Sequence, residues 1–203
     1  KVKASLRVGG ILLAAGAGRR FGGDKRCALL HDGTTVLQRS LDRLSAVCDT
    51  TLLVLGPHED AQALGLRLPP GVTVMNAPRS AGGMGFSLAD AIGCAGAQAW
   101  DACLVSLGDK PFIAEHTFRI VRELVERHDF VVPTHDGAHG HPVGFARRYF
   151  EILARLEGDA GARGLIREHG GEACFVELDD GGMLADVDTP EQLEALQRRF
   201  ADV

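Results

Sequence analysis

The sequence is poor in aromatic residues and has no excess of basic ones. Phe, Trp and Tyr make up 5% of the 203 residues, and 22 Lys and Arg face 27 Asp and Glu, which gives a formal net charge of −5 at pH 7. Broad binding to nucleic acid or to an anionic membrane surface requires a basic face. This balance argues against both, and we expect a small-molecule substrate.

Long hydrophobic runs and paired cysteines are also missing. The longest apolar stretch, Val8 to Ala17, is well short of the about 20 residues that cross a bilayer, and we expect neither a membrane segment nor a secretory leader. The five cysteines are odd in number, scattered and without a CxxC pair, so they signal neither a zinc site nor a disulfide framework. They predict reduced thiols and a cytoplasmic protein.

Glycine, in contrast, is abundant. The chain has 26 glycines among 203 residues, about 13% against a typical value of about 7%. They cluster at 16–23, 82–85, 137–144 and 158–164. Glycine is needed where the backbone takes positive φ or comes close to a ligand, so these clusters are candidate ligand loops.

Short apolar runs alternate with stretches of helical periodicity along the whole chain. This pattern is typical of βα units around a mostly parallel sheet, and the length suits one domain. We predict a Rossmann-like, single-domain three-layer α/β/α sandwich over residues 1–203. The expected strands are 8–14, 51–55, 72–76, 102–106, 130–133 and 173–177. The expected helices are 35–47, 59–64, 87–100, 115–127, 146–156, 161–168 and 191–200.

Two of the expected helices carry start signals. Ser87 with Asp90 and Thr189 with Gln192 have the spacing of capping boxes, and Pro190 falls at a first helical position. Ser87 is therefore expected to be an N-cap whose helix end can also face a phosphate.

The glycine-rich loop after the first strand is the prime site candidate, because open α/β sheets bind ligands beyond the carboxyl ends of their strands. A Walker loop fails, since Asp24 follows Gly18 and Gly23 at the expected spacing and Lys25 comes one place late. Phe21 replaces the third glycine of the dinucleotide fingerprint, which disfavours a nicotinamide oxidoreductase. Backbone N–H groups in such a turn can still form an anion nest, and two cations, Arg20 and Lys25, complement a triphosphate. The alternative is a surface turn with solvated basic residues.

Residues 13–25 resemble the signature LAAGxGxRFGxxK of nucleotidyltransferases related to the molybdenum cofactor cytidylyltransferases and guanylyltransferases. Five further segments resemble family segments in the family's order: residues 83–88, 107–112, 140–143, 158–163 and 186–191. The resemblance implies a nucleotide site. The residues it assigns to that site are Leu13, Ala14, Ala15, Gly16, Gly18, Arg20, Lys25, Gly83, Ser87 and Asp109.

Asp109 follows an apolar run, which places a carboxylate at the carboxyl end of a strand. Mg²⁺ typically takes one or two carboxylates and leaves its other positions to water and phosphate, although a turn aspartate is the plainer interpretation. In the family this aspartate is a metal ligand. Lys110 departs from the family's usual Gln or Met, and it either contacts phosphate or points into solvent.

Asp186 and Asp188 precede the last helix, where acids stabilise a helix N-terminus by about 0.3–1 kcal/mol. Because Thr189 and Gln192 already supply the cap, Asp188 is available for another role. The resemblance implies that Asp188 completes the metal site with Asp109, and it favours Asp186 much less.

On the acceptor side, the resemblance assigns His141, Pro142, Asp159 and Arg163. Asp159 and Arg163 are equally compatible with a surface ion pair at i,i+4 spacing. His135 and His139 lie near His141, but without supporting cysteines or an HExxH helix a zinc site is disfavoured.

Together, the resemblance implies a Mg²⁺-dependent enzyme that transfers CMP from CTP to a molybdopterin-type cofactor and releases pyrophosphate. Arg20, Lys25 and Asp109 are the expected catalytic residues. Cytidylyltransferases carry LAAG where guanylyltransferases carry LAGG, so Ala15 favours CTP over GTP. A GTP-dependent enzyme for the same cofactor and a nucleotide-binding module without turnover remain alternatives, and the oligomeric state is left open.

Overall fold

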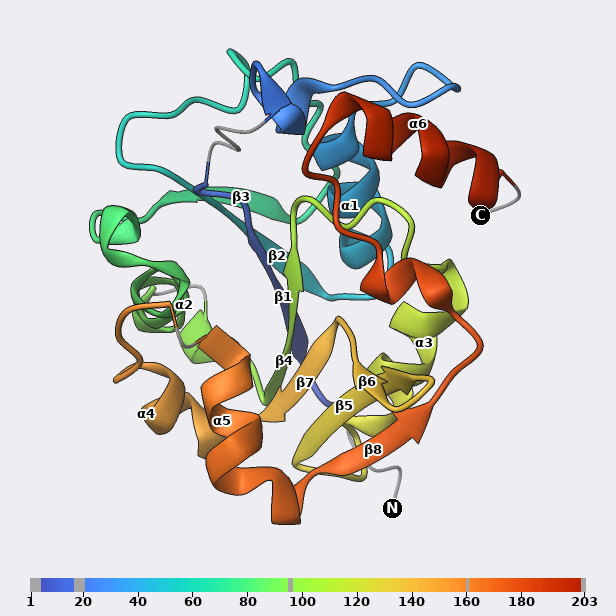
Figure 1. Cartoon of the computed structure of the whole chain (residues 1–203). Coiled ribbons are helices and arrows are strands. Elements are labelled where there is room, and N and C mark those ends of the chain that lie inside the picture. The colour runs from blue at the N-terminus through green and yellow to red at the C-terminus, as the bar shows by residue number, and fades with distance from the viewer. Residues whose placement is uncertain (1–4, 17–20, 95–96, 160, 202–203) are drawn as a thin grey trace.

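The computed structural model describes residues 5–16, 21–94, 97–159 and 161–201, with only the backbone at 162–163, and its centre is one eight-stranded sheet (Figure 1). The strand order is β3-β2-β1-β4-β7-β5-β6, with β8 paired to β5. The strands are β1 Val8–Leu13, β2 Thr50–Leu55, β3 Val72–Asn76, β4 Ala102–Leu107, β5 Phe130–His135, β6 Ala138–His139, β7 Val143–Ala146 and β8 Cys174–Glu177.

The sheet is mostly parallel, as predicted. β3, β2, β1 and β4 run parallel to one another, and β8 runs parallel to β5. Two strands are exceptions. β7 lies between β4 and β5 and is antiparallel to both, and β6 forms an antiparallel hairpin with β5. The carboxyl ends of β3, β2, β1 and β4 therefore lie at the same edge of the sheet.

Helices cover both faces of the sheet, which confirms the three-layer prediction (Figure 1). α1 and α3 lie on one face, and α2, α4 and α5 on the other. None of the helices in the described ranges is long and apolar enough to span a bilayer. Their bounds are α1 Val36–Ser45, α2 Met84–Gly93, α3 Glu115–Leu124, α4 Phe150–Leu153, α5 Gly161–His169 and α6 Pro190–Arg199.

The apolar run of β1 is continuous because side chains on both of its faces are covered. Ile11 and Leu13 pack into the cluster that contains Leu88 of α2. Leu12 packs into the opposite cluster with Leu37 of α1. Burial of each such side chain is worth about 1.5–3 kcal/mol, so β1 is fixed between the two helical layers and its carboxyl end is a rigid base for the loop that follows.

Two of the expected helices are wrong. Residues 59 and 60 have no regular structure and residues 61–65 form a turn, with the Glu59 carboxylate accepting hydrogen bonds from the Gly56 amide, at 2.7 Å, and from the Arg26 guanidinium. The helix expected over 146–156 is reduced to α4, since Ala146 is the last residue of β7, opposite Ala102 of β4.

The expected start of α2 is also wrong, whereas that of α6 is confirmed. α2 begins at Met84, and Ser87 is a buried residue inside the helix whose amide donates to the Gly83 carbonyl. Asp90 instead accepts from the Arg79 Nε at 2.7 Å, and the helix ends at Gly93 rather than at Trp100. In α6, Thr189 Oγ1 accepts from the Gln192 amide at 3.2 Å and Pro190 is the first helical residue.

Candidate active site

The site is built where β1 and β4 end side by side. Leu13 is in register with Leu107, and the Gly108 amide donates to the Leu13 carbonyl at 2.9 Å. A Cβ on Gly108 would lie 2.9 Å from the Cβ of Ala14, so only glycine allows the segments that follow β1 and β4 to leave the sheet this close together. The segments that start at Ala14 and at Asp109 are therefore neighbours.

Lys25 joins the two carboxylates that were predicted to hold a metal. Its Nζ lies 2.8 Å from Asp109 Oδ2 and 3.3 Å from Asp188 Oδ1. Burial disfavours the charged ammonium, but the hydrogen bonds and charges of Asp109 and Asp188 outweigh it, so the pKa of Lys25 is raised above its ordinary value. The structure thus brings together three residues from distant parts of the chain, with the Lys25 ammonium between the two carboxylates.

Asp188 reaches this position because α6 is docked against the rest of the molecule. Val187 and Leu193 are buried in a cluster with Phe112, which follows the Asp109 loop. The Asp188 amide donates to Gln192 Oε1 at 3.1 Å, which ties Asp188 to the first turn of α6, and its carboxylate faces Lys25.

The donor set of Asp109 and Asp188 fits a hard divalent cation. Their side chains are 28% and 43% exposed and converge on a single positively charged nitrogen. Mg²⁺ needs only one or two protein carboxylates when substrate phosphate and water complete its shell. Within the described ranges no group of three or more His, Cys, Asp or Glu could hold a metal, so any metal bound at this pair depends on outside ligands.

Lys110 and Asp186 form a second ion pair beside the first. Lys110 Nζ lies 2.5 Å from Asp186 Oδ1, and Lys110 is only 6% exposed. Lys110 therefore does not point into solvent, which corrects one of the two sequence-based alternatives. The contact also engages the Asp186 carboxylate.

A cavity of about 230 Å³ opens next to Lys25 and Asp109. It is lined by the end of β1 and its loop, by Met84 of α2 and by Gly108. Of the predicted nucleotide-binding residues, Leu13, Ala14, Gly16, Lys25 and Asp109 line it, whereas Ala15, Gly83 and Ser87 do not. Gly18 and Arg20 lie outside the described residues.

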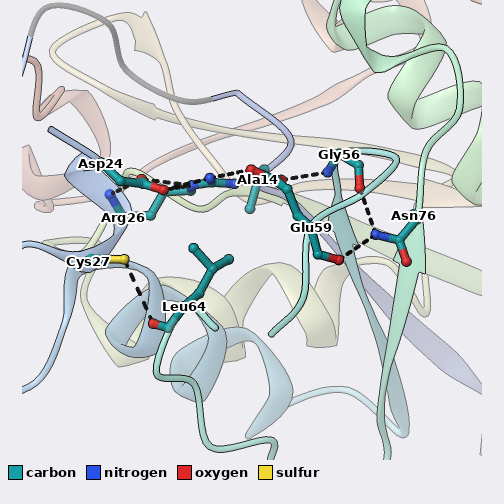
Figure 2. A network of polar contacts seen from close by, with 8 residues as sticks. All are labelled: Ala14, Asp24, Arg26, Cys27, Gly56, Glu59, Leu64 and Asn76. Atoms are coloured by element: carbon teal, nitrogen blue, oxygen red, sulfur yellow. Dashed lines mark hydrogen bonds and ion pairs between the residues drawn. The ribbon is translucent and has the colours of Figure 1, made fainter. Parts of the chain in front are cut away.

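Arg26 is the main residue that sequence reasoning missed. It is 3% exposed and donates to the Ala14 carbonyl at 2.6 Å, to Asp24 at 2.7 Å and to Glu59 at 2.5 Å (Figure 2). Hydrogen bonds with Glu59, and then with Asp24, raise the pKa of Arg26 despite its burial. Arg26 therefore fixes the start of the glycine-rich loop to the loop after β2.

The predicted acceptor segment meets the start of α2. The Gly85 amide donates to the Gly158 carbonyl at 2.7 Å. Gly83 has a φ of 124°, and a Cβ there would lie 2.5 Å from Asp159 Oδ1. The structure thus joins the regions assigned to nucleotide and to acceptor, while the Arg163 side chain lies outside the described residues.

His141 and Pro142, joined by a cis peptide, lead into β7. Because Val143 pairs with Val105 of β4 in antiparallel register, they lie beside the end of β4 that leads to Asp109. The neighbouring histidines are engaged elsewhere: His135 Nδ1 lies 2.8 Å from the Leu178 carbonyl, and the His139 ring stacks on Phe175.

The molecule is an open α/β sheet with a glycine-rich segment after its first strand, and Asp109 just after β4 and Asp188 just before α6 both contact Lys25. Ligands of such sheets bind beyond the carboxyl ends of the strands, as in nucleotide-binding α/β proteins. A family model described as "MobA-like NTP transferase domain" matches residues 10–173. The chain therefore belongs to the MobA-like NTP transferase family.

Curated relatives carry several different names. The purine catabolism protein PucB of Bacillus subtilis is 30% identical, with 95% of this chain and 97% of the relative covered. Nicotine blue oxidoreductase of Paenarthrobacter nicotinovorans is also 30% identical, over 93% and 96% of the two chains. The molybdenum cofactor cytidylyltransferase of Escherichia coli is 24% identical, over 95% and 97%.

Among solved structures, Rv0371c of Mycobacterium tuberculosis superposes with a TM-score of 0.79 at 27% identity, covering 95% of this chain and 98% of that one. A complex of Rv0371c with manganese has a TM-score of 0.73 at 30% identity, covering 96% and 100%. The match to the family model thus shows the family of this chain, and the superpositions show that it shares its fold with these solved structures.

Proposed function

We propose that this protein is a divalent-metal-dependent cytidylyltransferase that moves CMP from CTP to a molybdopterin-type acceptor and releases pyrophosphate. The observation that carries the proposal is the convergence of Asp109, Asp188 and Lys25 beside the cavity at the end of β1. Relatives named molybdenum cofactor cytidylyltransferase and guanylyltransferase support it. Residues 1–203 would act as one domain, in the cytoplasm.

The acceptor needs no strong base in this proposal. A phosphate monoester has a second pKa near 6, so a terminal phosphate on the acceptor is already a nucleophile at neutral pH. Asp109 and Asp188 would hold Mg²⁺, which supplies charge neutralisation at the phosphates. The remaining work is positioning and electrostatic stabilisation, as in other phosphoryl-type transfers.

In this proposal the Lys25 ammonium has two alternative partners, the two aspartates and the pyrophosphate group. Without metal, its ammonium neutralises Asp109 and Asp188. Once those carboxylates are engaged by a cation, the ammonium is free to turn to the leaving pyrophosphate, together with Arg20. Backbone N–H groups of the glycine-rich loop would complete the phosphate contacts.

The acceptor would enter between the 158–159 segment and the His141-Pro142 segment. Gly158 is hydrogen-bonded to the start of α2, and His141 and Pro142 flank the end of β4. Asp159 and Arg163 would contact the acceptor from one side and His141 and Pro142 from the other.

A pyrophosphate-release assay tests the proposal. The protein is incubated with Mg²⁺, each of the four NTPs in turn, and purified molybdenum cofactor. We expect release that depends on both CTP and the cofactor, and a modest preference for CTP over GTP of about ten- to two-hundred-fold. Tight CTP binding without release would instead identify the non-catalytic nucleotide-binding module.

One relative favours a second candidate. Nicotine blue oxidoreductase is 30% identical over almost the full length of this chain, although Phe21 breaks the dinucleotide fingerprint. Titration with NADH and NADPH, monitored by their absorbance and by calorimetry, separates the two functions. Saturable binding of a reduced nicotinamide, with no effect of added CTP, would replace the transferase proposal.

A further inference from the structure

A second cavity, away from the candidate active site, is lined by residues of α1 and α3. These two helices lie on the same face of the sheet (Figure 1). Its volume is about 550 Å³, which is in the range of small-molecule sites. Five of its lining residues are charged: Arg39, Asp42, Arg43, Glu115 and Arg119.

Arg43 is a buried cation that makes no ion pair with any residue that the structure describes. It is 8% exposed, and its guanidinium donates only to the carbonyls of Pro111, at 3.0 Å, and Ile113, at 2.5 Å. Its Nε is buried and has no hydrogen-bond partner in the described part of the chain. Burial, followed by the charge of Arg39, lowers the pKa of Arg43. A buried charge is costly, and Arg43 lines the cavity, so an oxyanion bound there would offset the cost of burying this guanidinium.

The other charges of the cavity differ in how they are engaged. Arg39 pairs with Asp32, and Asp42 accepts from Gln38 at 2.8 Å. Arg119 is exposed and makes no ion pair within the described ranges. Glu115, one turn before Arg119, is the one lining carboxylate without a protein ion pair among the described residues, and it would oppose an incoming anion.

We propose that the cavity between α1 and α3 is a binding site for a small phosphate-type oxyanion, held mainly by the guanidinium groups of Arg43 and Arg119. Guanidinium groups match the geometry of such oxyanions through paired N–H donors. Because Arg43 also holds the Pro111 and Ile113 carbonyls, the site is attached to the loop that carries Asp109. It is independent of whether the protein transfers nucleotides.

The test measures binding of inorganic pyrophosphate by calorimetry in metal-free buffer of low ionic strength. The parent protein is the full chain with Arg20→Ala and Lys25→Ala, which weakens anion binding at the candidate active site. Inorganic phosphate and a dicarboxylate such as malonate are titrated in parallel to establish the class of anion. We expect saturable binding of pyrophosphate, weaker binding of phosphate and the weakest of malonate.

Substitutions at exposed residues then locate the site without disturbing the core. Arg119→Gln should weaken pyrophosphate binding about tenfold, as expected for loss of one charged hydrogen bond. Glu115→Gln should strengthen it, because a repulsive charge is removed. Arg127→Gln, on the exposed surface just beyond α3, is the matched control and should change nothing.

Absence of saturable binding, or equal effects of Arg119→Gln and Arg127→Gln, would overturn the proposal, since the second result indicates only diffuse charge attraction. Malonate binding as tightly as pyrophosphate would overturn its assignment to a phosphate-type anion.

Discussion

At the scale of single residues, Lys25 decides how the candidate site is organised in the absence of metal. Its ammonium lies within 3.3 Å of a carboxylate oxygen of both Asp109 and Asp188. Two carboxylates this close would repel each other without a cation between them. A divalent metal held by this pair of aspartates, as proposed, would therefore compete with Lys25.

Removing the ammonium should separate these two roles. In Lys25→Ala we expect Mg²⁺ alone to raise the melting temperature more than it does in the wild type, because the metal no longer displaces a bound cation. In saturating Mg²⁺, CTP binding should weaken more than CMP binding, since Lys25 is assigned to the outer phosphates. Calorimetry with both nucleotides measures this difference, and equal losses for CTP and CMP would contradict the assignment.

Ala15 carries the proposed preference for CTP. The resemblance implies that the Cβ of Ala15 favours the smaller pyrimidine, and one methyl group in a pocket discriminates by about 1–3 kcal/mol. We expect Ala15→Gly to narrow or reverse the ratio of kcat/KM for CTP to that for GTP. A ratio that stays the same would remove Ala15 from base selection, in agreement with its absence from the cavity lining.

At the scale of elements, the start of α2 is joined to the loop before α5 through glycines. Gly83 has positive φ, and a Cβ there would lie 2.5 Å from the backbone of Gly158. Gly83→Ala should therefore lower the free energy of unfolding by about 1–3 kcal/mol, the range for a strained backbone position. Urea denaturation measures the loss.

The control comes from the other end of the same helix. Gly93 has open space around its Cβ position, so Gly93→Ala should be neutral or stabilise the helix by up to about 1 kcal/mol. Similar stability of Gly83→Ala and Gly93→Ala would show that the contact between α2 and residues 158–159 does not constrain the fold.

The elements that could be predicted from sequence are those whose signals are local. β1 and β3 are buried or half-buried runs with clear ends, and Thr189 with Pro190 marks the start of α6 unambiguously. Ser87 carries the same kind of signal, but the prediction that it is an N-cap is wrong. Gly83 is the N-cap of α2 one turn earlier, and the Asp90 carboxylate accepts from the Arg79 side chain.

The parts of the site that depend on distant contacts could not be predicted in the same way. Family resemblance selected Asp109, Asp188 and Lys25, and the structure brings these three together. Nothing local in the sequence pairs Arg26 with Glu59, 33 positions away, because their contact exists only after β1 and β2 lie side by side. β7 was missed for a similar reason: its four residues become a strand only by pairing with β4 and β5.

At the scale of the whole molecule, the Arg26 network makes stability depend on pH. Hydrogen bonds from Arg26, partly opposed by burial, hold the pKa of Glu59 below its usual value of 4.5 and the pKa of Asp24 below its usual value of 3.8. A carboxyl group with a lowered pKa in the folded state stabilises the fold above its unfolded pKa, and this contribution is lost as the pH falls through the folded value.

We therefore expect the free energy of unfolding to fall as the pH is lowered below about 4.5, and to fall less steeply in Glu59→Gln. Glu123→Gln, an exposed glutamate of α3, is the control and should follow the wild type. Chemical denaturation at a series of acidic pH values measures the slopes, and identical slopes for Glu59→Gln and wild type would remove this network from acid stability.

The central claim is that Asp109 holds the metal on which nucleotidyl transfer depends. Asp109→Asn keeps the shape of the side chain and much of its hydrogen bonding to Lys25 but removes its charge, so the fold should survive. The decisive measurement is the rate of CTP- and cofactor-dependent pyrophosphate release in Mg²⁺, for the wild type and for Asp109→Asn. We predict a loss of at least about 100-fold, the scale of a lost electrostatic contact in a transition state, with an intact thermal transition. Unchanged release from a folded Asp109→Asn protein would contradict the account.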